Sequence, residues 1–195
     1  MNWDGDFWVV DVEGNGARPP EMVELALVEV RGLIPTGERR HWLLRPNEPI
    51  TSMATRIHGI RNEDLAGAPG FEDIAEDVLE LIDASVLVGH NVRVELDVIG
   101  RALPNWVPAG AIDTLKLAKT VRPGLESYAL TALTKAFDLR VESEGDFRKG
   151  EHSAPHDALV TAALFRFLME ETPVERRAAA LEAANVKAAQ KELFP

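Results

Sequence analysis

The order of strand-like and helix-like segments restricts this chain more than any other feature of its sequence. Three short strand-like segments come first: Phe7 to Val10 ending at Asp11, Val23 to Val30, and Arg40 to Leu44. Short turns between consecutive strands indicate an antiparallel meander, because parallel strands need a long crossover connection. The turn predicted between the second and third strands is Gly32 to Gly37, with Pro35 inside it.

Helices and strands alternate in the rest of the chain. The hydrophobic pattern predicts helices over residues 71–82, 92–103, 113–120, 127–137 and 155–170, and strands over 85–88 and 109–112. Three strands followed by this alternation predict an α/β fold, with a five-stranded mixed sheet and helices on its faces. A length of 195 residues suits one such domain with a short appendage.

The appendage is a last predicted helix, Val174 to Leu193, which begins after Pro173. It is rich in Ala, Glu, Lys and Arg, so it cannot form a core alone. Its thin apolar stripe consists of Ala178, Leu181, Ala184, Ala188 and Leu193. We divide the chain into a main domain over 1–172 and a helical extension over 173–195. We expect the extension to pack on the domain or to contact a second copy or another partner.

The amino-acid composition and net charge limit which metal ions and nucleic acids the chain can bind. The chain has no cysteine, so any metal must be held by oxygen or imidazole, which favours Mg²⁺ or Mn²⁺. The net charge of −11 argues against coating long duplexes, but it is compatible with a metal-filled pocket for one strand end. The sequence has neither a secretory leader pattern nor an apolar run near the ~20 residues that span a bilayer. We therefore expect a cytoplasmic protein without membrane contacts.

Two acidic residues, Asp11 and Glu13, lie at the end of the first predicted strand. Residues two apart on a strand project from the same face, so these carboxylates repel and each is driven toward its neutral form. A divalent cation would remove that cost, which makes the pair a candidate metal site. The alternative is a solvated Asp-x-Glu on a turn, and such pairs are common.

Two later segments bring acids and a histidine to the ends of elements. The fourth strand leads through Asn91 into a helix that carries Glu95 and Asp97, although Asn91 also suits a helix N-cap. The last core helix follows His152 and carries Asp157 in its first turn. Capping and surface roles are the alternative for this second pair.

Taken together, these motifs resemble the DEDDh exonucleases of the DnaQ-like superfamily. That family includes the proofreading epsilon subunit of bacterial DNA polymerase III, exonuclease X, ribonuclease T and oligoribonuclease. The resemblance covers residues 6–170, so the main domain would be an exonuclease domain, and residues 123–139 are most similar to exonuclease X. Further segments that carry it are Leu44-Arg45-Pro46, Ile57-His58-Gly59-Ile60 and Ile112-Asp113-Thr114.

The resemblance implies a ribonuclease H-like fold and 3′→5′ exonucleolytic release of nucleoside 5′-monophosphates. It implies two Mg²⁺ or Mn²⁺ ions held by one helix acid and by Asp11, Glu13 and Asp157. Two ions ~3.5–4 Å apart activate a water and stabilise the leaving 3′-oxygen. His152 would be the general base that takes the proton from that water, as a side chain with an ordinary pKa of about 6.5 can do. The polar segment Gly145 to Gly150 would let His152 swing away without substrate.

The resemblance also places the 3′-terminal nucleotide against Val12, Gly14 and His58, with Val12 wedged between the last two bases. Asn91 would orient the substrate strand. The acidic charge and the single domain favour single-stranded or short DNA 3′ ends. Two alternatives stay open: an exoribonuclease acting on short RNA, and a non-catalytic nuclease-fold binding subunit.

The helix acid is either Glu95 or Asp97. Aligned without gaps, the family's aspartate falls on Glu95. Each helical residue advances by about 100°, so the two acids point to nearly opposite sides. The inward stripe is expected to consist of Val94, Val98 and Ile99. Because Glu95 borders that stripe, we expect Glu95 to be the metal ligand. The remaining histidines, which we expect to be structural or at the surface, are His41, His90 and His156.

Overall fold

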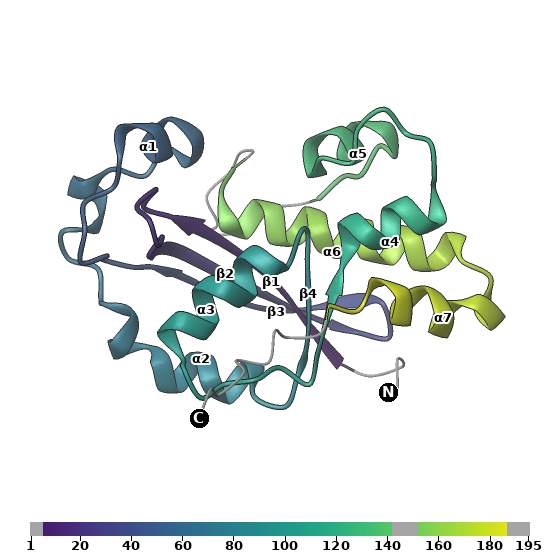
Figure 1. The fold of residues 1–195 in the computed structure, drawn as a ribbon, viewed down its shortest axis with the longest axis horizontal. Coiled ribbons are helices and arrows are strands. Elements are labelled where there is room, and N and C mark those ends of the chain that lie inside the picture. Colours follow the sequence, from purple (N-terminus) through teal and green to yellow (C-terminus); the bar gives the residue numbers. More distant parts are fainter. Residues whose placement is uncertain (1–5, 142–151, 187–195) are drawn as a thin grey trace, which may run out of the picture.

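The computed structural model describes residues 6–141 and 152–186, which form a five-stranded mixed sheet with helices on both faces (Figure 1). The strands are β1 (Asp6–Gly14), β2 (Met22–Arg31), β3 (Ile34–Leu43), β4 (Val86–Gly89) and β5 (Gly110–Asp113). Their order across the sheet is β3-β2-β1-β4-β5. The first three strands run antiparallel, whereas β4 and β5 run parallel to β1. The predicted fold class and sheet are confirmed.

The helices lie in two layers around this sheet. They are α1 (Ser52–His58), α2 (Ala75–Ile82), α3 (Arg93–Ala102), α4 (Thr114–Val121), α5 (Leu130–Ala136), α6 (Ala154–Glu171) and α7 (Val174–Ala184). One apolar cluster joins the sheet to α4, α5, α6 and α7, and a second joins the opposite face to α2 and α3. A third, smaller cluster lies under α1. Within the described ranges, no helix combines the length and the apolar character needed to cross a bilayer.

β1 divides its side chains between the two layers. Phe7 and Val9 belong to the cluster under α6, whereas Trp8 belongs to the cluster under α2 and α3. Because strand side chains alternate between faces, Asp11 and Glu13 continue the series of Phe7 and Val9. Both acids therefore emerge on the α6 side, where the apolar packing of the strand ends.

The hairpin between β2 and β3 differs from the prediction. The predicted turn over Gly32 to Gly37 and the predicted strand start at Arg40 are wrong. The turn consists of Gly32 and Leu33, with φ angles of 52° and 72°, as a tight two-residue hairpin requires. Pro35 lies inside β3, which is an edge strand, the place where a sheet accommodates proline.

The C-terminal helix is shorter than predicted. α7 ends at Ala184 instead of Leu193, because the next two residues pair with the free edge of β5. The backbone N–H of Val186 donates to the carbonyl of Ala111 at 2.6 Å. The predicted stripe is partly correct: Leu181 and Ala184 are buried with the α4 and α6 core, together with Ala180, but Ala178 is exposed. Ala188, Leu193 and the expected polar segment 145–150 lie outside the described residues.

Candidate active site

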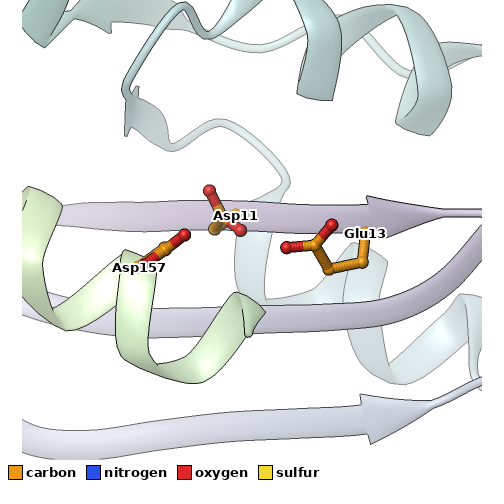
Figure 2. A group of neighbouring side chains, drawn as sticks. All are labelled: Asp11, Glu13 and Asp157. Carbon is orange, nitrogen blue, oxygen red and sulfur yellow. The ribbon is translucent and has the colours of Figure 1, made fainter. Parts of the chain in front are cut away.

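Three carboxylates from two elements converge at the end of the apolar core. Asp11 and Glu13 extend from β1, and Asp157 reaches them from the first turn of α6 (Figure 2). Each offers one oxygen, and these oxygens all lie within 4.8 Å of one another. All three residues are half-buried, so their mutual repulsion is weakly screened by water.

The position of Asp11 in this cluster shifts the pKa of its carboxyl group. Burial raises the pKa of its carboxyl well above the usual value, and the neighbouring charges of Glu95 and Asp157 raise it further. Without a cation, Asp11 therefore ionises less readily than an ordinary aspartate. Carboxyl groups with strongly raised pKa values are typical of functional sites. A bound cation would favour the ionised carboxylate instead.

Glu95 of α3 approaches the same region from the other side of β1. Its side chain is buried, and its pKa is raised to about 8. Desolvation is the main cause, and the negative charge of Asp113 also raises it. Its Oε2 atom is buried and makes no hydrogen bond to any part of the chain that the structure describes. A buried polar atom without a partner is costly, so Oε2 of Glu95 calls for a partner beyond the described residues.

Asp97 points the other way. Its side chain is 67% exposed and pairs with Arg101 one turn later on α3. Arg101 also donates to the carbonyl of Pro20 at 3.1 Å, so this pair links α3 to the loop after β1. The predicted inward stripe is partly wrong, because Val94 is 49% exposed while Val98 and Ile99 are buried.

Two histidines lie at the start of α6. His152 is exposed and has a φ of 64°, one residue before the N-cap of the helix. His156 is half-buried rather than fully exposed, and its Nδ1 lies 2.9 Å from Oδ1 of Asp157. Sequence reasoning gave His156 no role, and its position one residue before Asp157 is the only signal that could have suggested this contact.

A pocket of ≈ 290 Å³ opens beside Glu13. Its wall on the strand side includes Gly14, and its opposite wall is α1. His58 at the end of α1 is buried: its Nδ1 accepts from the N–H of Ile60, so its Nε2 carries the proton and donates to the carbonyl of Gly14 at 3.2 Å. The pocket is lined by Glu13, Gly14, Gly16, Pro20, Thr51, Met53, Ala54, Ile57 and His58.

Sequence reasoning missed α1 and therefore the outer wall of this pocket. The signals were present: Thr51 caps the helix by accepting from the N–H of Ala54, and Gly59 ends it with a φ of 75°. Gly16 is required where the loop after β1 passes α1, because a Cβ there would lie 2.3 Å from Oγ1 of Thr51.

Comparison with known proteins identifies the family to which this chain belongs. A model of the exonuclease family, RNase_T, matches residues 8–165. The chain belongs to this exonuclease family. This exonuclease is 32% identical over 174 residues to the DNA polymerase III subunit epsilon of Aquifex aeolicus, across 86% of this chain and 82% of that protein. It is 31% identical over 175 residues to the 3′-5′ exonuclease DinG of Bacillus subtilis, across 85% of this chain and 18% of DinG.

A solved structure of exonuclease X in complex with 5′ overhanging duplex DNA is also similar. It aligns with a TM-score of 0.73 and 28% identity, covering 90% of this exonuclease and 99% of exonuclease X. The predicted resemblance to DnaQ-like exonucleases and the ribonuclease H-like fold are confirmed, and the chain is a 3′→5′ exonuclease.

The remaining predicted site residues, Val12 and Asn91, belong neither to the group of close carboxylates nor to the lining of the pocket. Val12 is half-buried on the α3 side of β1. Asn91 is exposed with a φ of 64°, and its backbone N–H donates to Oδ1 of Asp113 at 3.0 Å. Asn91 is not the helix cap, because the N-cap of α3 is Val92.

The donor set of this exonuclease fits a hard divalent cation. The oxygens that converge are all carboxylate oxygens, the ligands that Mg²⁺ and Mn²⁺ prefer. The raised pKa of Asp11 is a cost that a bound cation would remove. The site therefore has the chemical character of a metal centre.

Proposed function

We propose that this exonuclease hydrolyses phosphodiester bonds from the 3′ end of single-stranded or short DNA and releases nucleoside 5′-monophosphates. The observation that carries the proposal is the convergence of Asp11, Glu13 and Asp157 beside the pocket under α1. DNA is favoured because similar proteins include epsilon subunits of DNA polymerase III and an exonuclease X that was solved with duplex DNA. The net charge of −11 favours strand ends over long duplexes.

Asp11, Glu13, Glu95 and Asp157 would hold two Mg²⁺ or Mn²⁺ ions. When bound, such ions neutralise the scissile phosphate, activate a water and stabilise the leaving 3′-oxygen. Glu95 is chosen over Asp97 because Glu95 is buried with an unpartnered oxygen, whereas Asp97 is exposed and paired with Arg101.

His152 would take the proton from the attacking water. It is exposed one residue before the N-cap of α6, and Asp157 lies in the first turn of the same helix. An exposed imidazole next to a metal-binding cluster can accept a proton and release it to solvent between turnovers. Its role differs from that of His156, which contacts Asp157 directly.

The pocket under α1 would hold the 3′-terminal nucleotide. Gly14 brings backbone close to the terminal 3′-hydroxyl, and His58 fixes that backbone through its bond to the Gly14 carbonyl. Val12, between Asp11 and Glu13 on β1, would separate the last two bases, and Asn91 would orient the strand behind them. Holding the end of the strand in this way would make hydrolysis exonucleolytic, because the pocket would position the terminal nucleotide beside the carboxylates.

Product analysis tests the proposal and decides between DNA and RNA. Oligonucleotides of one sequence, made as DNA and as RNA, are incubated with Mn²⁺, and the products are separated by chromatography. We expect deoxynucleoside 5′-monophosphates to accumulate faster than ribonucleoside 5′-monophosphates. Faster release from RNA would replace the DNA assignment, and release of 3′-monophosphates would contradict the proposed chemistry.

A further inference from the structure

Glu24 of β2 is a buried carboxylate next to the site that the proposed chemistry does not use. Its side chain is fully buried, and it is the partner of Glu13 in the β1–β2 ladder. It faces α6, because Ala26, two residues further along β2, packs in the same cluster as Ala154 of α6. A buried charge is strongly destabilising unless its oxygens are satisfied, so its partners carry information.

Both oxygens of Glu24 are engaged, by two different elements. Oε2 accepts from the backbone N–H of Ala154, the first residue of α6, at 2.9 Å. Oε1 lies 2.9 Å from Nε2 of His41 on β3, and the imidazole N–H donates to the carboxylate. The side chain of His41 is 17% exposed. Glu24 therefore ties β2 and β3 to the start of α6, across 130 residues of sequence.

The start of α6 is the part of that helix on which the site depends. Asp157 lies in its first turn, and its backbone N–H donates to the carbonyl of Ser153 at 2.9 Å. The first N–H groups of a helix need acceptors from outside the helix, and a negative charge there is favourable. Glu24 supplies such an acceptor from the sheet, so the first turn of α6 is fixed relative to β1 and β2.

We propose that Glu24 and His41 are positioning residues of the active site. They hold the first turn of α6 where Asp157 meets Asp11 and Glu13, an inference that rests on the proposed function of that cluster. Glu24 acts through Ala154 rather than as a metal ligand, because both of its oxygens are already engaged, one by the Ala154 N–H and the other by His41. The sequence contains the two residues but gives no sign of the link, because β2 and α6 are far apart along the chain.

Two substitutions at Glu24 separate hydrogen bonding from charge and size. Glu24→Gln keeps an acceptor for the Ala154 N–H and can donate its amide N–H to the other tautomer of His41. Glu24→Met has a similar length but no strong acceptor. We expect Glu24→Met to lower both kcat and Mn²⁺ affinity by about 10–100-fold, the usual effect of losing a residue that orients a ligand. Because Ala154 does not line the pocket under α1, KM for the oligonucleotide should change by less than about threefold.

Hydrogen exchange gives a readout that is independent of turnover. Amides at the start of α6, including Asp157, should exchange faster in Glu24→Met, whereas Glu24→Gln should match the wild type in exchange, Mn²⁺ affinity and kcat. A folded Glu24→Met with wild-type kcat and wild-type Mn²⁺ affinity would overturn the proposal. It would also be overturned if Glu24→Gln were as impaired as Glu24→Met, since charge alone would then be responsible.

His41→Phe decides the matter if Glu24→Met fails to fold. This change removes the second partner of Glu24 at a partly exposed position but leaves the bond to Ala154 in place. We expect a smaller loss of kcat, about 3–10-fold, with faster exchange at the start of α6. Unchanged kcat and exchange would overturn the proposal. An inactive wild type whose Mn²⁺ affinity still falls in these variants would refute the proposed function and leave the positioning role supported.

Discussion

At the scale of single residues, the site is built from groups that are unfavourable in the metal-free chain. Burial raises the pKa of both Asp11 and Glu95, and the charge of Glu95 raises the pKa of Asp11 further. Such a cost is compatible with a stable fold only if it is offset, and the two apolar layers around the sheet provide the offset. A bound cation would then turn the same arrangement into a stabilising one.

The choice between the two acids of α3 can be tested by a matched pair of substitutions. Glu95→Gln should lower kcat by more than the roughly 10–100-fold that loss of an outer-shell partner costs, because it removes a proposed ligand. Asp97→Asn removes the same charge two residues later and should change kcat by less than about threefold, since exposed ion pairs contribute little. Steady-state kinetics with Mn²⁺ checks both. The opposite ranking would mean that Asp97 is the ligand.

The raised pKa of Glu95 predicts how metal-free stability depends on pH. A folded-state pKa of about 8, against 4.5 for the ordinary side chain, favours the protonated form. This contribution to stability is fully present below the unfolded value and is lost as the pH rises through about 8. In EDTA, the Tm of Glu95→Gln should therefore exceed that of the wild type by a margin that grows between about pH 6 and pH 8.5.

The size of that margin follows from the length of the domain. A change of 1 kcal/mol corresponds to about 2–4 °C in Tm for a domain of 150–250 residues, so we expect a difference of at least this size at the higher pH. Asp97→Asn is the control, because its carboxylate is exposed. A constant margin across the pH range would show that Glu95 titrates normally in the folded protein.

His152 should affect turnover without affecting metal binding. Replacing it with Ala should lower kcat by ~10²–10⁴-fold, the usual contribution of a general base. Mn²⁺ affinity measured by calorimetry should stay within about threefold, because a base that contacts only water is not a ligand. An equal loss of affinity and turnover would instead identify His152 as a metal ligand.

Residues of the site were predictable where the local sequence determines which face of an element their side chains share. Asp11 and Glu13 follow an apolar strand, so the alternation of strand side chains is enough to place them on a common face. The contacts of Glu24 with His41 and Ala154 could not be predicted, because they depend on how three elements pack. Pattern alone identifies which residues share a face of one element, but not which faces meet.

At the scale of elements, helix and strand boundaries were predicted correctly where the local pattern determines them, and wrongly where they depend on packing between elements. The helix carrying Asp157 was predicted over 155–170 and is observed at Ala154–Glu171, because its pattern is long and its start is marked by Pro155. β3 was predicted too short because Pro35 and Gly37 are turn residues in most contexts, and only an edge position accommodates them. α7 was predicted too long because its composition gives no sign of the pairing at Asn185.

α7 should stabilise the domain without taking part in the chemistry. Leu181 is buried against the α4 and α6 core, whereas Val174 at the start of the same helix is 73% exposed. Leu181→Ala should lower the free energy of unfolding by about 2–5 kcal/mol. Val174→Ala should change it by no more than about 0.5 kcal/mol, as surface substitutions usually do.

Chemical denaturation measures both changes, and Mn²⁺ titration shows whether the site survives. A chain that ends before Pro173 should also be less stable than the wild type but should still bind Mn²⁺. Equal stability of the two point variants would contradict the packing of α7. Loss of metal binding in a folded truncated chain would show that the extension belongs to the site.

At the scale of the whole molecule, the mixed sheet explains why the site lies where it does. β1 is the central strand of the order β3-β2-β1-β4-β5, so helices on both faces can bring side chains to its end. α6 contributes Asp157 from one side and α3 contributes Glu95 from the other. The pocket under α1 lies at the same end of β1, because Glu13 and Gly14 line it.

The most direct test of this account follows the degradation of 5′-labelled single-stranded DNA by the wild type, Asp11→Ala and Glu13→Ala. With Mn²⁺ or Mg²⁺, the wild type should produce a ladder that shortens one nucleotide at a time from the 3′ end, and EDTA should stop it. Both variants should be folded, at least as stable as the wild type without metal, and inactive, because each loses a proposed ligand and a repelling charge. Near-normal degradation by both variants, or cleavage that persists in EDTA, would contradict the proposed two-metal site at the end of β1.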